Sequence, residues 1–102
     1  MTKKNSVKFI AHSCVLAKYG DFLILDSPAL YSIGKNEIVF DNCDEITAFY
    51  EYFIVKFGNS YKLINQDLEV LIDNCQLISA YNNTLTIKIN DKYALYKISE
   101  LN

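Results

Sequence analysis

The sequence predicts an all-β fold made of short antiparallel strands. Aromatic and β-branched residues, which favour the pleated surface of a strand, are abundant: the 102 residues include eight Tyr and six Phe but only three Gly and one Pro. Apolar side chains alternate with polar ones, as at Leu85, Ile87 and Ile89, which is the period of a strand with one apolar face. A stretch of sequence also recurs at a fixed spacing, as in repeat proteins.

The recurring stretch is the most informative feature of the chain. Residues 36–65 align without a gap on residues 68–97, at an offset of 32, and nine of these 30 pairs are identical. Chance would give about two or three identities in such a window. Residues 7–26 are expected to form an earlier, incomplete copy, in which 14–26 parallels 52–65. Residues 1–102 are therefore expected to form a single β-repeat domain of about two and a half 32-residue units.

Four short strands are expected in each complete unit. They are predicted at 7–12, 14–19 and 21–26 in the first copy, at 37–41, 44–49, 52–57 and 60–65 in the second, and about 32 residues later in the third. Gly58-Asn59 and Asn90-Asp91 tolerate left-handed backbone and supply turns. Successive strands are therefore expected to pair as hairpins.

Two segments depart from this pattern. Ser27–Lys35, which holds the only proline, is expected to be a longer connection between copies. Asp44–Phe53 could begin a helix, but the equivalent residues 76–85 are rich in Asn, Thr and β-branched side chains. A strand is therefore expected in both copies.

The way in which the units pack follows from their size. A unit of four antiparallel strands cannot bury both of its faces by itself, so neighbouring units are expected to stack. Short local hairpins in series favour a blade-like array or part of a propeller. A meandering sandwich or a partial barrel is the competing layout, and the sequence leaves open whether the units form an open arc or a closed dimer.

The repeated unit resembles the WG repeat, whose pattern runs roughly GKWGYID, followed by GK.VIP..YD.I..F..GLA.V. The turn-and-strand part of that pattern corresponds to 20–26, 59–65 and 91–97, and the GK.VI part to 34–39. Asp44-Glu45-Ile46 and Phe49 correspond to YD.I..F. The signature Trp is replaced by Phe22, Tyr61 and Tyr93, and the Gly after it by Leu23, Lys62 and Ala94.

The resemblance implies a β-repeat scaffold with no fixed chemistry. Small divergent WG-repeat proteins occur among bacterial immunity proteins, including those of contact-dependent growth inhibition, which neutralise toxins delivered between competing cells. On this ground the chain is expected to bind a protein toxin.

The charged residues restrict the class of partner. All ten basic residues are Lys, the formal charge is −2 and the isoelectric point is about 5.2. Arg is the usual reader of phosphate and guanine, so its absence argues against nucleic acid and the acidic balance favours a basic protein partner. No apolar run is long enough to cross a membrane, and an odd number of cysteines fits a reducing compartment. The protein is therefore expected to be cytoplasmic, with no membrane partner.

Metal binding and catalysis are not expected. Cys14, Cys43, Cys75 and His12 would give the ligand count of a zinc site, but no two have the short Cys-x-x-Cys spacing that positions two ligands. Cys43 and Cys75 occupy one position of two successive units and are expected to be small buried residues. His12 and Cys14 share a strand face but lack a third group to orient the imidazole. The sequence thus predicts no metal, no cofactor and no enzymatic activity.

Residues that break the repeat are the candidates for a specific binding site. One unit carries an acidic and aromatic cluster, Asp44, Glu45, Tyr50, Glu51 and Tyr52, where the next has Gln76, Leu77, Asn82, Asn83 and Thr84. Tyr offers a large contact area at low entropic cost, and carboxylates steer a basic partner. Asp41 and Asp21 are weaker candidates, since Asx side chains in turns also cap their own backbone.

These observations lead to a functional hypothesis. We expect an immunity protein whose acidic cluster covers the active-site cleft of a basic toxin, with a nuclease as the expected activity. The alternative is a non-catalytic β-repeat interaction or assembly module, in which the differences between units are ordinary surface drift.

Overall fold

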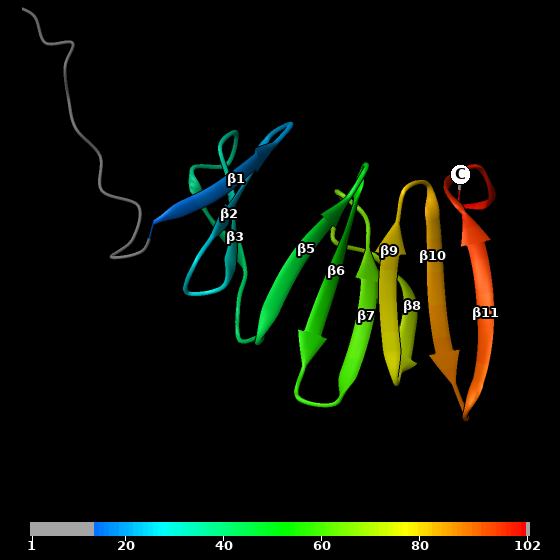
Figure 1. Ribbon diagram of the computed structural model, residues 1–102. Helices are drawn as coiled ribbons and strands as arrows, with labels where there is room; N and C mark the ends of the chain where they lie inside the picture. Colours follow the sequence, from blue (N-terminus) through cyan, green and yellow to red (C-terminus); the bar gives the residue numbers. More distant parts are fainter. Residues whose placement is uncertain (1–13, 102) are drawn as a thin grey trace, which may run out of the picture.

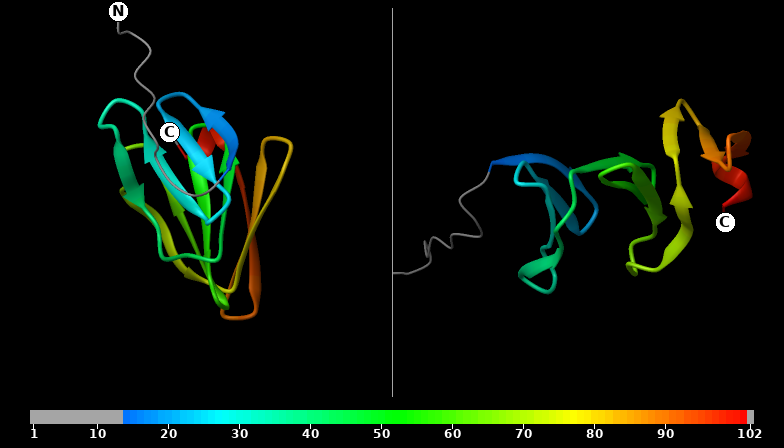
Figure 2. Two further views of the ribbon diagram at one scale, coloured as in Figure 1. Left: turned by 90° about the vertical axis from the view of Figure 1, so that its left-hand side faces the viewer. Right: turned by 90° about the horizontal axis from the view of Figure 1, so that it is seen from below.

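The computed structural model describes residues 14–101, and within that range the fold is all-β, as the sequence predicts. Eleven antiparallel strands are followed by one short 3₁₀ turn, Ile98–Glu100, and this part of the chain contains no α-helix. The predicted strand at 7–12, together with His12, lies outside the described residues. The strands form three sheets that follow one another along the molecule (Figures 1 and 2).

Each sheet is a meander in which every strand pairs with the next one in the sequence. The first sheet contains β1 (Val15–Tyr19), β2 (Phe22–Leu25), β3 (Ala29–Ser32) and β4 (Glu37–Phe40). The second contains β5 (Glu45–Phe49), β6 (Tyr52–Phe57), β7 (Ser60–Ile64) and β8 (Val70–Cys75). The third contains β9 (Leu77–Tyr81), β10 (Thr84–Ile89) and β11 (Lys92–Lys97).

The local pattern of the sequence located most of these strands. The four predicted between residues 37 and 65 are confirmed to within one residue at each end by β4, β5, β6 and β7. Glu45–Phe49 is a strand, so the helical alternative for this segment is wrong. Its side chains alternate between two faces: Ile46 and Ala48 pack in the core that contains Phe22, whereas Phe49, on the same face as the exposed Glu45 and Thr47, packs in the core that contains Leu85.

The segment 27–35 was predicted to be a connection, and this prediction is wrong, because it contains β3. All four residues of β3 are buried, so the strand shows no polar alternation that would mark it. Pro28 stands immediately before the strand, where its missing N–H costs no ladder hydrogen bond. The first sheet therefore has four strands, and β1 takes the place that β5 has in the second sheet, whereas the predicted alignment set β1 against β6.

Residues with left-handed backbone recur at a regular spacing from Asn36 to Asn90. Positive φ angles at Asn36, Asn42, Tyr50 and Gly58 recur 32 residues later at Leu68, Asn74, Asn82 and Asn90. Such angles favour Gly, Asn and Asp, so most of these positions carry residues that tolerate them. They turn the chain at the ends of strands and keep the hairpins in register.

The second sheet is buried on both faces because it lies between the other two. Phe53 and Val55 on β6 pack with Phe22 of the first sheet, and the Phe53 and Phe22 rings meet edge to face with centroids 5.4 Å apart. The intervening Ile54 packs with Leu85 of the third sheet. Successive side chains on one strand therefore belong to two different cores, which explains why β6 begins with four apolar residues.

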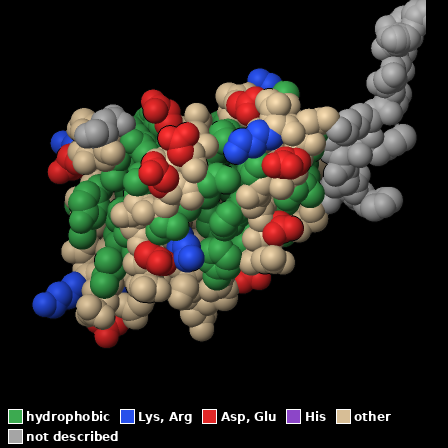
Figure 3. All heavy atoms as spheres, turned by 180° about the vertical axis from the view of Figure 1, so that it is seen from behind, with side chains coloured by type: hydrophobic (Ala, Val, Ile, Leu, Met, Phe, Trp, Pro, Cys, Tyr) green, Lys and Arg blue, Asp and Glu red, His purple; other side chains and the backbone are tan. Residues whose placement is uncertain are grey.

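The third sheet buries only one face against described residues. Leu85 and Ile87 point toward the second sheet, whereas Thr84, Thr86 and Lys88, on the other face of β10, are only half-buried. Figure 3 shows hydrophobic side chains on its left, where the third sheet lies, among polar and charged ones. No helix among residues 14–101 is long and apolar enough to span a bilayer.

Candidate partner-binding surface

The strands run alternately toward two ends of the molecule. One end, which we call the loop end, carries the turns 20–21, 50–51 and 82–83 and the loops 33–36 and 65–69, and it lies at the top of Figure 1. The opposite end carries the turns 58–59 and 90–91 and the links between sheets at 41–44 and 76. All twelve carboxylates of the protein, but only seven of its ten lysines, lie within the described residues.

The predicted partner-binding residues divide between these two ends and do not form one surface. The loop end holds the exposed Asp21, Tyr50 and Glu51, whereas the opposite end holds the exposed Asp41, Asp44 and Glu45. A strand rises about 3.3 Å per residue, so Glu45 and Tyr50, at either end of β5, are roughly 16 Å apart. A partner that covers one group would have to span a whole strand to reach the other.

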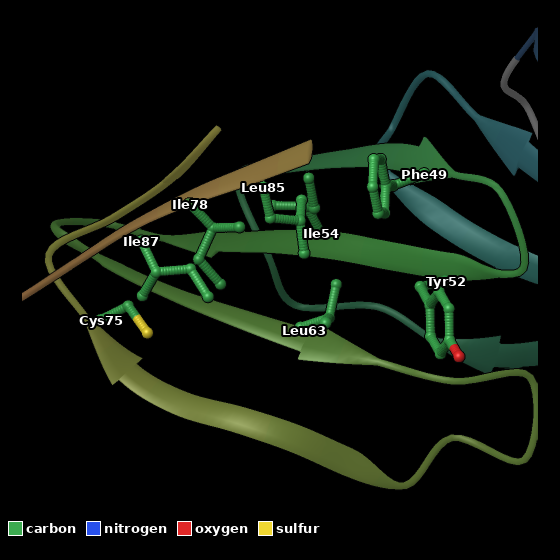
Figure 4. Close-up of a cluster of buried hydrophobic side chains, with 8 residues drawn as sticks. All are labelled: Phe49, Tyr52, Ile54, Leu63, Cys75, Ile78, Leu85 and Ile87. Carbon is green, nitrogen blue, oxygen red and sulfur yellow. The ribbon is translucent and has the colours of Figure 1, made fainter. Parts of the chain in front are cut away.

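The seventh predicted residue, Tyr52, lies inside the fold. Its side chain is 6% exposed and packs with Phe49, Ile54 and Leu63 in the core between the second and third sheets (Figure 4). Its hydroxyl donates a hydrogen bond to the carbonyl of Leu101 at 3.2 Å. Tyr52 therefore serves the core, and only its small exposed part lines a cleft, beside Glu51.

Asp44 closes a hairpin. Its Oδ2 accepts a hydrogen bond from the Gly58 N–H, and its own N–H donates to the Lys56 carbonyl at 2.8 Å. Gln76, at the same position of the next unit, likewise accepts the N–H of Asp91 through its Oε1 at 2.8 Å. The exchange of Asp44 for Gln76 thus preserves a structural contact, so it does not by itself indicate a binding site.

Asp21 orders the loop that follows β3. Its Oδ1 accepts the N–H of Gly34 at 2.8 Å, and its Oδ2 accepts the hydroxyl of the buried Ser32 at 2.9 Å. A Cβ at Gly34 would stand only 3.1 Å from this carboxylate, so a larger residue there would make the Asp21 side chain shift. Asp21 therefore presents its charge at the loop end while fixing the shape of the loop 33–36.

The second loop of this end is fixed by an asparagine. The side-chain oxygen of Asn65 accepts the N–H groups of Asp67 and Glu69, both at 2.9 Å, and its amide donates to Glu69 Oε1 at 2.8 Å. Leu68 takes a left-handed φ of 65° between them. These contacts tie the loop to the end of β7 and hold Asp67 in place.

Two clefts meet at the loop end. One, of about 360 Å³, is lined by Asp21, Lys35, Gln66 and Asp67 among others; the second, of about 340 Å³, is lined by Glu51 together with the same Gln66 and Asp67. Carboxylates from three segments thus border two neighbouring clefts that share Gln66 and Asp67. The side chain of a lysine or arginine would find acceptors of the correct charge there.

The carboxylates of the opposite end have more lysines close by. Glu45 stands in register with Lys56 across β5 and β6, and Lys62 Nζ lies 4.0 Å from Asp73 Oδ1 in the one ion pair found among residues 14–101. Among the described residues that line the two clefts of the loop end, by contrast, Lys35 is the only cationic side chain. The negative charge along these two clefts is therefore less compensated.

The cysteines are placed as packing residues. Cys14 is exposed, whereas Cys43 and Cys75 contact two different cores. Burial raises the pKa of both the Cys43 and the Cys75 thiols, and neighbouring aspartates raise it further. A thiol with a raised pKa stays protonated at neutral pH and is a poor nucleophile and metal ligand. Within the part of the chain that the structure describes, no three metal-binding side chains gather.

Gln66 and Asp67 were missed by the analysis of the sequence. They fall outside the aligned blocks 36–65 and 68–97, so they were not compared with Gly34 and Lys35, which stand 32 residues earlier. That comparison was the available signal, because the acidic Asp67 stands where the basic Lys35 stands 32 residues earlier.

Comparison with known proteins adds no identification. No protein-family model, no curated protein and no solved structure matches the chain.

Proposed function

We propose that the three sheets are successive units of one β-repeat, stacked as an open, blade-like array. The strands β5, β6 and β7 begin 32 residues before β9, β10 and β11, and the left-handed positions keep the same spacing. Each unit buries a face that it could not bury alone. The resemblance of the unit to the WG repeat supports the same architecture.

We further propose that the protein is a bacterial immunity protein, which binds a basic toxin at its loop end and covers the toxin's active-site cleft. The observation that carries this proposal is the pair of neighbouring clefts bordered by Asp21, Glu51 and Asp67, with Lys35 as the only cation among the described residues that line them. A nuclease is the expected toxin, because its cleft must be basic to hold phosphates. The carboxylates would occupy the places of those phosphates, in the cytoplasm of the protected cell, without catalysis.

The loop end has two further properties that favour binding. Tyr50 is exposed in the turn beside Glu51, and its ring meets the buried Phe49 edge to face with centroids 5.0 Å apart, which restricts its movement. The loops 33–36 and 65–69 are held by side-chain hydrogen bonds before any partner arrives. Little conformational entropy remains to be lost on binding, and this increases affinity.

Co-expression with the product of the gene immediately upstream tests this proposal. We expect a one-to-one complex, weakened by salt, and cells protected from that product. The double variant Glu51→Lys, Asp67→Lys should lower the affinity by about a hundredfold, because two attractive contacts become repulsive. The matched variant Asp41→Lys, Glu45→Lys, at the opposite end, should change it by less than about threefold.

Each result of this experiment has a distinct meaning. A harmless upstream product that does not bind the chain would contradict the immunity function. A complex that is weakened equally by both double variants, or only by the variant at the opposite end, would retain the function and contradict the assignment of the loop end. Thermal melting of each variant shows whether it is folded.

The second candidate function is an assembly module without a toxin partner. This function is favoured by β11, an edge strand that pairs only with β10 among the described residues. An exposed strand edge is a template for pairing with another chain.

A further inference from the structure

Among the described residues the third sheet has three strands, whereas each of the other two has four. β4 and β8 are fourth in their sheets, whereas β11, third in its own, pairs with β10 alone among the described residues. The residues of β7 that pair with β8 are Tyr61, Leu63 and Ile64, and their counterparts 32 residues later are Tyr93, Leu95 and Tyr96. Leu63 is fully buried, whereas Leu95 is 68% exposed. No residue within 14–101 therefore takes, beside β11, the place that β8 takes beside β7.

The edge of β11 is also the most suitable strand edge for pairing. β1, β4 and β8 are each interrupted by a register shift against their neighbour, and such bulges discourage pairing with another chain. β9 contacts β7 of the second sheet, and β5 exposes the polar Glu45 and Thr47. β11 pairs with β10 over six consecutive residues without a shift, and all six are exposed.

The backbone groups available on this edge can be assigned. The Ile98 N–H donates to the Asn83 carbonyl at 2.8 Å, toward β10. Backbone groups alternate in direction along a strand, so those of Tyr93, Leu95 and Lys97 point away from β10. The Lys97 N–H accordingly bonds Glu100 Oε1, at 2.8 Å, and is capped. The open stretch of the edge is therefore centred on residues 93–95.

We propose that β11 pairs with β11 of a second copy of this chain, antiparallel, with Ala94 opposite Ala94 of the partner subunit. The outward backbone groups of Tyr93 then face those of Leu95 of the partner subunit, and those of Leu95 face Tyr93 of the partner subunit. Asp91, in the turn that precedes β11, then lies nearest to Lys97 of the partner subunit. Its Oδ1 also accepts a hydrogen bond from Gln76 Nε2 at 3.3 Å, and a two-fold axis brings these opposite charges together twice. The two third sheets become one sheet of six strands, and both open edges are used.

The charges select this register. Moving the centre to Tyr93 would place Lys97 opposite Ile89 of the partner subunit, and moving it to Leu95 would place Lys97 opposite Tyr93 of the partner subunit. Only the centre at Ala94 gives each Lys97 an opposite charge while keeping outward backbone groups paired. The pairing is isologous and closed, so it yields a dimer and no fibre.

This interface is independent of the proposed toxin-binding site. No residue of β11 lines either cleft of the loop end. Dimerisation is measured on the purified chain alone, so a chain that stays monomeric leaves the immunity proposal unaffected. Likewise, a chain that binds no toxin leaves the dimer proposal unaffected.

Light scattering or sedimentation across a concentration range reaching millimolar tests the dimer. We expect the wild-type mass to approach twice 11.7 kDa. Leu95→Pro removes an N–H that points away from β10, so it should return the mass to one chain while the sheet persists. Leu16→Lys on β1 is the matched control, since Leu16 is 65% exposed on another edge strand, and it should leave the dimer unchanged.

Charge exchange tests the register. Asp91→Lys and Lys97→Asp should each weaken the dimer, because each sets like charges opposite one another, whereas an equal mixture of the two variants should form heterodimers. Circular dichroism establishes that each variant is folded. A wild-type chain that stays monomeric at the highest concentration, or a dimer that Leu16→Lys abolishes and Leu95→Pro does not, would overturn the proposal. A dimer that neither single charge variant weakens would overturn the register.

Discussion

At the scale of single residues, the second sheet shows how position along a strand decides which core a side chain joins. Phe53 and Ile54 are adjacent in β6, yet one packs toward the first sheet and the other toward the third. Both are buried, and neither neighbour can replace the other because successive side chains point to opposite faces. Each of these residues therefore supports a separate interface.

Replacing Phe53 with Ala should lower the free energy of unfolding by about 3–5 kcal/mol, because it leaves a cavity beside Phe22. Denaturation in urea measures this loss. Tyr81→Ala is the control, since the Tyr81 side chain is 78% exposed, and it should change stability by less than about 0.5 kcal/mol. Similar losses in the two variants would mean that Phe53 does not lie between the sheets.

The buried thiols predict a loss of stability at alkaline pH. The ordinary thiol pKa of 9.0 applies to the unfolded chain, and burial raises the pKa of Cys43 and Cys75 in the folded protein. As the pH rises above about 9, these thiols ionise in the unfolded chain before they do so in the folded protein. This ionisation lowers the free energy of the unfolded state, so the stability of the fold decreases. The double variant Cys43→Ala, Cys75→Ala should show a smaller fall between pH 8 and 10 in the same denaturation assay. Parallel pH profiles would contradict the raised pKa values.

At the scale of the elements, the hairpins are held by two devices, left-handed turn residues and side chains that accept turn amides. Asp44 and Gln76 each accept an N–H from the turn of a neighbouring hairpin, and Asp21 does the same for the loop 33–36. Carboxylates in such positions contribute to stability whether or not they also meet a partner. The two roles can be separated by experiment.

Asp21→Ala should lower the free energy of unfolding by about 1–3 kcal/mol, because it removes two hydrogen bonds and deprives the buried Ser32 hydroxyl of its acceptor. Glu51→Ala, in the corresponding turn of the second sheet, is the matched control, and we expect a change within about 0.5 kcal/mol. Thermal and chemical denaturation measure the free energy of unfolding of both variants. An Asp21→Ala variant as stable as the wild type would show that the loop is held by other contacts.

At the scale of the whole molecule, the outer face of the third sheet is more polar than the corresponding face of the second sheet. On the face of β6 that meets the third sheet stand Tyr52 and Ile54, and at the same positions of β10 stand Thr84 and Thr86. The last sheet thus presents polar side chains where an inner sheet presents apolar ones. In the repeat array proposed above, a polar outer face suits a unit that is not covered by another, and it accounts for the exchange of Tyr52 for Thr84 that drew attention in the sequence.

Making the last sheet resemble an inner one should therefore cause association. In a Leu95→Pro background, which removes pairing through β11, the variant Thr84→Tyr, Thr86→Ile should form larger species in light scattering, because an apolar face becomes exposed. The same background with Thr84→Ser, Thr86→Ser should remain monomeric. A Tyr–Ile variant that stays monomeric and soluble would contradict the capping role of this face.

The sequence by itself determined the fold class, the position of most strands and the turns that join them. These are local properties: alternation of apolar side chains, and residues such as Gly58 and Asn90 that tolerate left-handed backbone. It did not reveal β3, because a short strand with no polar face resembles any apolar segment.

Only the tertiary structure decided which side chains are exposed and which of them lie together. The sequence grouped Tyr52 with Asp44 and Glu51, but stacking of the sheets buries Tyr52, and the length of β5 sets the two carboxylates at opposite ends. It is folding that joins Glu51 to Asp67, from a separate loop, along one cleft. The physical reason is that strands and turns depend on neighbours in the chain, whereas burial and the grouping of charges depend on which segments the packed sheets bring side by side.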